Sequence, residues 1–223
     1  MTFSIVARCP RTGEYGVGIA TYSPNVGVRC PVVVPQRGAA SLQAVANPYL
    51  LPIAQKLIAS ALTAEKIVSE LLASDPRPES RQILIVDVYG RSFAYTGEKS
   101  PVWAGHITGD GYAVAGNVLA SEAVVTAMAK AFEDSLNETL AERLMRSVEA
   151  GRDAGGSLKD RIPLRYWYMV NNLFQLSIYE SNFMINPRPS CAEYGIGSAQ
   201  WFHITCSAQL CQCPDGGSGV WTM

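Results

Sequence analysis

Residues 2–23, TFSIVARCPRTGEYGVGIATYS, decide how the rest of the chain is organised. Two runs of strand-forming residues, 3–9 and 17–22, flank a turn rich in proline and glycine, so the stretch predicts a β-hairpin. Thr2 stands at the start of the first strand, directly after Met1. A methionine before a small residue is usually trimmed in cells, and we therefore expect Thr2 to become a free N-terminus.

A free terminal threonine combines two groups that amide hydrolysis needs. Its hydroxyl is a nucleophile, and its α-amino group, with a pKa near ~8, can act as the general base for that hydroxyl. N-terminal-nucleophile amide hydrolases use this arrangement. Most chains that begin Met-Thr are not hydrolases, so the assignment depends on the sequence that follows.

Length and charge narrow the classes of protein to consider. The 223 residues are enough for one domain with a substantial core. With 19 acidic against 18 basic residues, the net charge of −1 gives no electrostatic footprint for nucleic acid or an anionic membrane. No segment approaches the ~20 continuous apolar residues that span a bilayer. We expect a cytoplasmic protein with no nucleic-acid or membrane partner.

The six cysteines are expected to be reduced thiols, because the chain has no export signal and is long for a disulfide framework. His203 with Cys211 and Cys213 does not have the spacing of a zinc site. We therefore expect no metal and no organic cofactor.

The predicted elements run in the order strands, two helices, strands, two helices. After the hairpin, strands are predicted for residues 28–35, 38–46, 81–88, 92–96 and 112–117. Helices are predicted after Pro48, after Thr63 as N-cap, after Ser121 as N-cap, and over residues 140–148. The segments 103–106 and 109–111 are predicted to be turns. This order suits helices packed outside antiparallel sheets, an α+β fold, better than a doubly wound βαβ repeat.

Several tracts, in the right order, resemble the family called domain of unknown function 1028, which is placed in the N-terminal-nucleophile hydrolase superfamily. The matching residues are 2–8, 43, 46–48, 81–82, 87, 96–97, 103–106 and 116–119. The resemblance covers residues 2 to about 156 and implies a four-layer αββα sandwich with Thr2 at the catalytic strand end. It implies no substrate, because the family lacks an agreed one. We expect a domain over residues 1–156 and a divergent tail over residues 157–223.

The tail changes character, since it holds four of the six cysteines and its apolar residues follow no clear period. Trp167, Phe174 and Ile178 could line one side of a helix, but helix caps are absent. Read one base out of register, the codons of residues 166–170 encode Leu, Val, Tyr or His, and Gly, and a family member should have Leu-Val-Tyr-Gly here. We hypothesise a frameshift, real or introduced in sequencing. The alternative is a genuine divergent extension, and an intact frame in independent reads of the coding DNA near Gly156 would exclude the frameshift.

Thr2 is the expected nucleophile. The side-chain amide of Asn117, or backbone N–H groups near residues 43–45, would supply an oxyanion hole, although an Asn after a Gly is equally typical of a turn. His106 would assist proton transfer near neutral pH, but a single His in a turn is more often a hydrogen-bonded loop residue.

Three residues are predicted to bind substrate. Arg81 would clamp a substrate carboxylate, unless it pairs with Asp87 or a backbone carbonyl, which is the commoner role. Gln43 and Asn47 would bind polar groups of the substrate, although an Asn before Pro48 is also a common entry from a loop into a helix.

The sequence thus predicts hydrolysis of a linear C–N amide bond, in a small molecule or a peptide, through an acyl ester on Thr2. Two alternatives stay open: a non-catalytic binding or assembly protein on the same sandwich, and an inactive frameshifted product. The sequence also leaves a homo-oligomer open.

Overall fold

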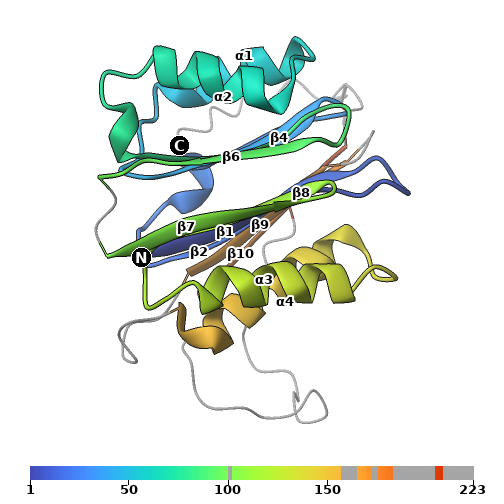
Figure 1. The fold of residues 1–223 in the computed structure, drawn as a ribbon. Coiled ribbons are helices and arrows are strands. Elements are labelled where there is room, and N and C mark those ends of the chain that lie inside the picture. The colour runs from blue at the N-terminus through green and yellow to red at the C-terminus, as the bar shows by residue number, and fades with distance from the viewer. Residues whose placement is uncertain (100–101, 157–164, 172–174, 183–203, 208–223) are drawn as a thin grey trace, which may run out of the picture.

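The computed structural model describes residues 1–99, 102–156, 165–171, 175–182 and 204–207, the last three ranges as β-strands. Figure 1 shows four layers: helices α1 and α2, a four-stranded sheet, a seven-stranded sheet, and helices α3 and α4. The predicted α+β fold, a four-layer αββα sandwich, is confirmed.

The seven-stranded sheet has the N-terminal hairpin near its centre. Its strand order is β11-β10-β9-β2-β1-β8-β7, and all neighbouring strands are antiparallel. The strands are β1 (Thr2–Arg8), β2 (Tyr15–Thr21), β7 (Trp103–Gly109), β8 (Tyr112–Leu119), β9 (Arg165–Asn171), β10 (Gln175–Asn182) and β11 (Ile204–Ser207). The register sets Thr2 between Thr21 of β2 and Asn117 of β8.

The four-stranded sheet has the order β3-β4-β5-β6 and is also antiparallel. Its strands are β3 (Pro31–Val34), β4 (Gly38–Ala44), β5 (Arg81–Val86) and β6 (Ser92–Thr96). The register aligns Gln43, Gln82 and Thr96 in one row across three strands. Strand β3 is shorter than predicted because the chain forms a short helical turn, η1 (Val26–Val28), just before it.

The helices lie where the sequence predicts them. Helices α1 (Leu50–Ala59) and α2 (Ala64–Ala73) cover the four-stranded sheet, whereas α3 (Ala123–Asp134) and α4 (Leu140–Gly151) cover the seven-stranded sheet. Thr63 caps α2 as predicted, since its hydroxyl accepts a hydrogen bond from the Lys66 amide at 3.2 Å. Helix α3 begins one residue later than a Ser121 cap implies, although the Ser121 hydroxyl still accepts from the Ala123 amide at 3.3 Å. Two short turns, η2 (Pro78–Ser80) and η3 (Arg152–Gly156), complete the elements.

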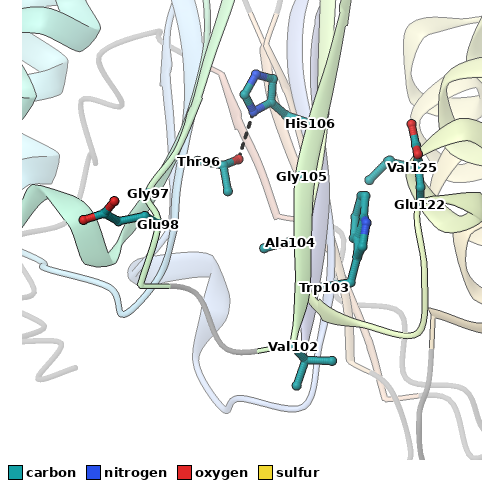
Figure 2. Close-up of a pocket in the computed structure, with 10 residues that line it drawn as sticks. All are labelled: Thr96, Gly97, Glu98, Val102, Trp103, Ala104, Gly105, His106, Glu122 and Val125. Atoms are coloured by element: carbon teal, nitrogen blue, oxygen red, sulfur yellow. Dashed lines mark hydrogen bonds between the residues drawn. The ribbon is translucent and has the colours of Figure 1, made fainter.

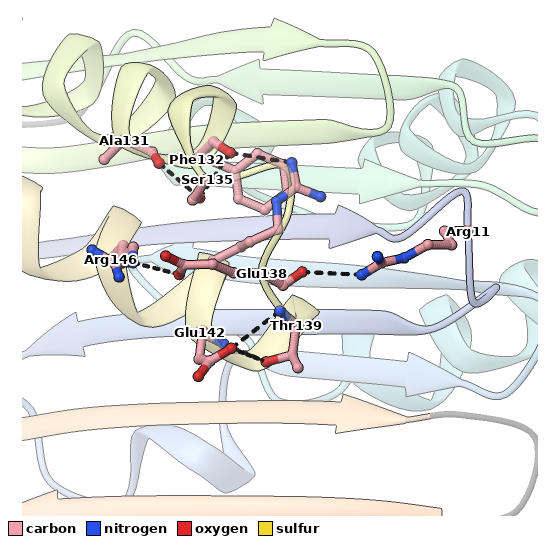
Figure 3. A network of polar contacts seen from close by, with 9 residues as sticks. Arg11, Ala131, Phe132, Ser135, Glu138, Thr139, Glu142 and Arg146 are labelled. Carbon is pink, nitrogen blue, oxygen red and sulfur yellow. Dashed lines mark hydrogen bonds and ion pairs between the residues drawn. The ribbon is translucent and has the colours of Figure 1, made fainter.

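The turn of the hairpin reaches the loop between α3 and α4, which ties the N-terminal strands to the outer helical layer. Arg11 donates to the carbonyl of Glu138 at 3.4 Å, and the Glu138 carboxylate pairs with Arg146 (Figure 3). Thr139 and Glu142 form a reciprocal cap at the start of α4. The loop is therefore held from both sides.

Strand β1 separates two parts of the core. Phe3 and Ile5 are fully buried among residues of α3 and α4, whereas Val6 packs with Leu84 and Val86 of the facing sheet. Because side chains alternate between the two faces of a strand, Thr2 and Ser4 point with Val6 into the space between the sheets. The Ser4 hydroxyl confirms this direction, since it donates to Ser41 of β4 at 3.1 Å.

Two predictions of local structure are wrong. Residues 103–106 are not a turn but the start of edge strand β7, in which the Trp103 ring covers Gly105. A β-carbon on Gly105 would lie 2.7 Å from that ring, so the glycine that favoured a turn is a close-packing position inside a strand.

The helix considered in the tail does not form, because the described residues there are strands. Trp167 lies in β9 and Ile178 in β10, and β9 pairs with β2 over its whole length. Phe174, His203, Cys211 and Cys213 lie outside the described residues. Among the described residues, no helix is long and apolar enough to cross a membrane.

Candidate functional site

Thr2 is the first residue of β1. It is half-buried and faces the space between the two sheets. Its hydroxyl oxygen is 2.9 Å from the hydroxyl oxygen of Thr21, its register partner in β2. Thr21 donates its one hydroxyl hydrogen to the Met1 carbonyl at 3.1 Å, so Thr2 must be the donor to Thr21. The Ser23 amide also donates to the Thr21 hydroxyl, at 3.2 Å. While Met1 is attached, Thr21 thereby fixes the direction of the Thr2 hydroxyl.

Met1 blocks the α-amino group of Thr2 while it remains attached. Its own terminal amine is partly buried, and desolvation lowers the pKa of that amine. The Met1 side chain packs against the core between the seven-stranded sheet and its helices.

A small cavity of about 30 Å³ opens beside Thr2. Thr21 and Ser23 line it from the β2 side, and Gln43 and Ala44 line it from β4. The volume is enough for ordered water or a small group of a ligand. Ala44 has φ of 71°, which is uncommon for a residue with a side chain, and it turns the chain at the end of β4.

Gln82 of β5 connects the two sheets and was not predicted as a site residue. It is fully buried. Its side-chain oxygen accepts from Gln43 Nε2 at 2.7 Å and from Asn117 Nδ2 at 3.0 Å. Its nitrogen lies 2.9 Å from the Thr96 hydroxyl and 2.9 Å from the carbonyl of Gly116. The side chains of Gln43, Gln82 and Asn117 thus form one buried group of amides, which we call the amide cluster.

The structure brings Asn117 next to Thr2, as the sequence-based prediction requires. The two residues are direct partners in the register of β1 and β8, and their side chains share one face of the sheet. Asn117 is 4% exposed and donates one N–H to Gln82. The next residue, Val118, has φ of 57°, a strained value for a β-branched side chain. Asn117 therefore belongs to a strand end and not to a simple turn.

The structure does not bring His106 to Thr2. His106 is the register partner of Ala115, which is the partner of Ser4, so it lies two strands away and two residues along. Two strand spacings alone are about 10 Å, beyond hydrogen-bond reach. His106 Nδ1 is instead 2.9 Å from the Thr96 hydroxyl, as Figure 2 shows. Desolvation lowers the pKa of the His106 imidazole.

His106 and Thr96 lie in a separate open pocket of about 580 Å³ at the edge of the seven-stranded sheet. Trp103 and Val125 line its other side, across strand β7 from Thr96 (Figure 2). Gln82 and Asn117, both buried, stand between this pocket and Thr2. The Thr2 cavity and this pocket are thus distinct hollows, with the amide cluster between them.

Arg81 and Asn47 are held by Asp75. Arg81 is 4% exposed and donates to Asp75 through Nε at 2.5 Å and through Nη2 at 2.9 Å, and it also donates to the Val45 carbonyl. These bonds from Arg81, with a further one from the Asn47 side chain, hold the pKa of the Asp75 carboxyl below its usual value. Asp87, the partner considered from sequence, instead accepts the Ala64 amide at the start of α2.

The residues that the sequence analysis missed had only weak local signals. Thr21 is the predictable one, because a regular hairpin over residues 2–21 pairs the two threonines directly. Gln82 begins an otherwise apolar run, which reads as a strand start when the facing sheet is not known. Among the described residues, no group of His, Cys, Asp and Glu side chains is arranged to hold a metal ion.

A solved structure agrees with this architecture. The crystal structure of protein SPO2555 from Silicibacter pomeroyi, which carries the family description DUF1028, superposes with a TM-score of 0.74 and 25% identity. The match covers 82% of this chain and 79% of that one. Anbu (ancestral β-subunit) from Yersinia bercovieri aligns weakly, with a TM-score of 0.36 and 11% identity over 75% of this chain and 80% of its own.

No curated protein matches the chain. The model of one family, described as a family of unknown function, matches residues 2–162, which extends six residues beyond the limit expected from sequence. The chain belongs to this family of unknown function, DUF1028.

Proposed function

We propose that this protein is an N-terminal-nucleophile hydrolase that cleaves a C–N amide bond through an acyl ester on Thr2. One observation carries the proposal: Thr2 is the first residue of the central strand β1, its hydroxyl lies 2.9 Å from that of Thr21, and it lines a cavity with Gln43. Loss of Met1 would place a free amine on the same residue.

In the proposed reaction, Thr2 Oγ1 attacks the substrate carbonyl carbon while its hydroxyl proton passes to the α-amino group of Thr2. The resulting ammonium protonates the leaving nitrogen as the C–N bond breaks, which leaves an acyl ester on Oγ1. A water molecule then attacks the ester, gives one proton back through the amine to Oγ1, and releases the carboxylic acid. No external cofactor is needed for this proton balance.

Asn117 is the side-chain donor that we propose for the developing oxyanion. It stands directly opposite Thr2, and its bond to Gln82 uses only one of its two N–H hydrogens. Gln43, in the cavity wall, is proposed to contact the substrate. Because of its distance from Thr2, His106 receives no direct role in the chemistry.

The first test is the mass of the N-terminus of the mature chain. Loss of Met1 is expected, and a screen of small amides and short peptides should then yield a substrate that Thr2→Ala cleaves roughly a thousandfold or more slowly. Thr2→Ser should keep part of the activity because it retains both groups. Thr12→Ala, in the exposed hairpin turn, is the matched control and should behave as the unchanged chain.

The competing function is ligand binding or assembly without catalysis. Retention of Met1 on the mature chain would favour it, because Thr2 would then have no free amine to act as base. Equal turnover by Thr2→Ala and the unchanged chain would refute the hydrolase assignment. The cytoplasmic location and a homo-oligomeric state remain predictions.

A further inference from the structure

The cavity beside Thr2 has one charged side chain in its wall, that of Arg29, among the described residues. Arg29 is exposed, and its guanidinium makes no hydrogen bond or ion pair with any described residue. A guanidinium offers five N–H donors in a planar fork that matches a carboxylate. A free guanidinium at the wall of a cavity is therefore available to a ligand.

The backbone around Arg29 is fixed by hydrogen bonds, although its side chain has no partner in the described part of the chain. The Arg29 and Cys30 amides both donate to the Val26 carbonyl at 3.1 Å. Val26 and Cys30, which flank the turn, are 3% and 7% exposed. Buried anchors on both sides hold the base of the arginine in place, so a ligand that binds it orders only the side chain.

Among the residues that the structure describes, no acidic group lines the cavity and offsets this charge. The Cys30 thiol also lines the cavity, and burial raises its pKa to about 11 although Arg29 opposes the shift, so the thiol stays neutral. Arg81, the arginine first considered as a carboxylate clamp, donates to Asp75 through Nε and Nη2 and to the Val45 carbonyl through Nη1. Arg29 is therefore a better candidate than Arg81 to bind a substrate carboxylate.

The size of the cavity limits what lies next to Thr2. Its volume of about 30 Å³ admits a short, unbranched part of a ligand. Outside it, Val28 and Val45 are next in the chain to residues of the wall and are 77% and 51% exposed. The surroundings of the cavity thus combine one cation with apolar surface.

We propose that Arg29 determines specificity at the Thr2 site by binding a carboxylate, so that the substrate is a short-chain amide with a free carboxylate a few bonds from the scissile carbonyl. This inference rests on the proposed hydrolase function. The apolar side chains outside the cavity would receive the leaving group.

A matched pair of substrates tests the inference. The succinyl and butyryl amides of 7-amino-4-methylcoumarin differ only in a terminal carboxylate against a methyl group. The unchanged chain should prefer the succinyl amide by about tenfold or more in kcat/KM, mainly through KM, because the bond between Arg29 and the carboxylate is made in the ground state as well. The preference should fall as salt is added.

Arg29→Gln should bring the ratio of the two substrates close to one, because kcat/KM for the succinyl amide falls more than kcat/KM for the butyryl amide. Arg29→Lys should keep part of the preference, and Arg29→Glu should reverse it. Arg37→Gln is the matched control, since Arg37 is exposed at the opposite end of β4 and the variant loses the same charge. A control variant that also lost the preference would show that net charge alone is responsible, and would overturn the inference.

A binding measurement separates this inference from the proposed function. The Thr2→Ala chain should bind succinamate more tightly than butyramide in an NMR titration, and Arg29→Gln should remove the difference. Succinamate binding that depends on Arg29 supports the inference even if neither coumarin amide is cleaved. Equal binding of both probes would refute the role of Arg29 but not the proposed hydrolase function. Cleavage that depends on Thr2 but not on the carboxylate would have the same consequence.

Discussion

Gln82 joins the two sheets through its side-chain amide. Replacement by Leu would leave Gln43 Nε2 and Asn117 Nδ2, now 2.7 and 3.0 Å from the Gln82 oxygen, without that acceptor in a buried space. Each unsatisfied buried group costs about 1–3 kcal/mol, so we expect Gln82→Leu to lower the free energy of unfolding by about 2–5 kcal/mol in urea denaturation.

The matched control for this change is Gln55→Leu on α1, where the glutamine is exposed. We expect the control to alter the free energy of unfolding by less than about 0.5 kcal/mol. Similar urea midpoints for both variants would mean that the amide cluster does not hold the sheets together.

His106 should titrate below the usual histidine pKa of 6.5, because desolvation disfavours its charged form. Because the pKa of His106 is lower in the folded chain, the unfolded chain binds a proton at His106 at a higher pH than the folded chain does as the pH falls. His106 therefore contributes stability above about pH 6.5, and this contribution is lost as the pH falls through the unfolded pKa to the folded one. The chain has two histidines, so one NMR titration with His106→Gln for assignment measures the value. A midpoint at or above 6.5 would contradict the expectation.

Asp75 and Arg81 join the end of α2 to the start of β5. Both side chains are nearly inaccessible, at 0% and 4% exposure. Removal of one partner leaves a buried charge alone, so Arg81→Met should lower the free energy of unfolding by about 3–5 kcal/mol. The Asp75 pKa lies below its usual 3.8, so this pair contributes stability above that pH and loses it as the pH falls through the folded pKa. Arg81→Met should therefore flatten the decline of stability in acid.

The same variant distinguishes a structural arginine from one that binds substrate. If Arg81 acts only through Asp75, the folded fraction of Arg81→Met should keep the succinyl preference proposed for Arg29. Loss of the preference for the succinyl amide, with Arg29 intact, would indicate that Arg81 binds the substrate carboxylate.

Elements with local signals were predictable from sequence, and those that depend on contacts between layers were not. The Thr63 cap and the apolar spacing of Leu140, Leu144 and Val148 fix their helices without knowledge of the rest of the fold. Strand β7 was missed because its glycine lies under the Trp103 ring, a contact that no local pattern encodes. The amide cluster was missed for a similar reason, since it needs the register of both sheets at once.

At the scale of the whole molecule, β9 decides whether the central hairpin has an open edge. All seven residues of β2 are buried, and β9 pairs with each of them. Backbone pairing depends little on which side chains the partner carries, and residues 165–171 contain no proline and several aromatic or β-branched residues. A segment of foreign sequence, as the frameshift hypothesis requires, can thus still supply the missing strand.

Truncation tests this role of β9. A chain that ends at Gly156 lacks β9 and leaves the backbone of β2 unpaired, and such an open edge promotes association between copies. We expect it to form concentration-dependent oligomers in size-exclusion chromatography with light scattering, and to unfold at a lower urea concentration than the full chain. A chain that ends at residue 182 keeps β9 and β10 and is the control, expected to stay close to the full chain in both measurements. If the shorter chain is as stable and as dispersed as the control, β2 needs no partner on this side, and the divergent tail contributes nothing to the fold that positions Thr2.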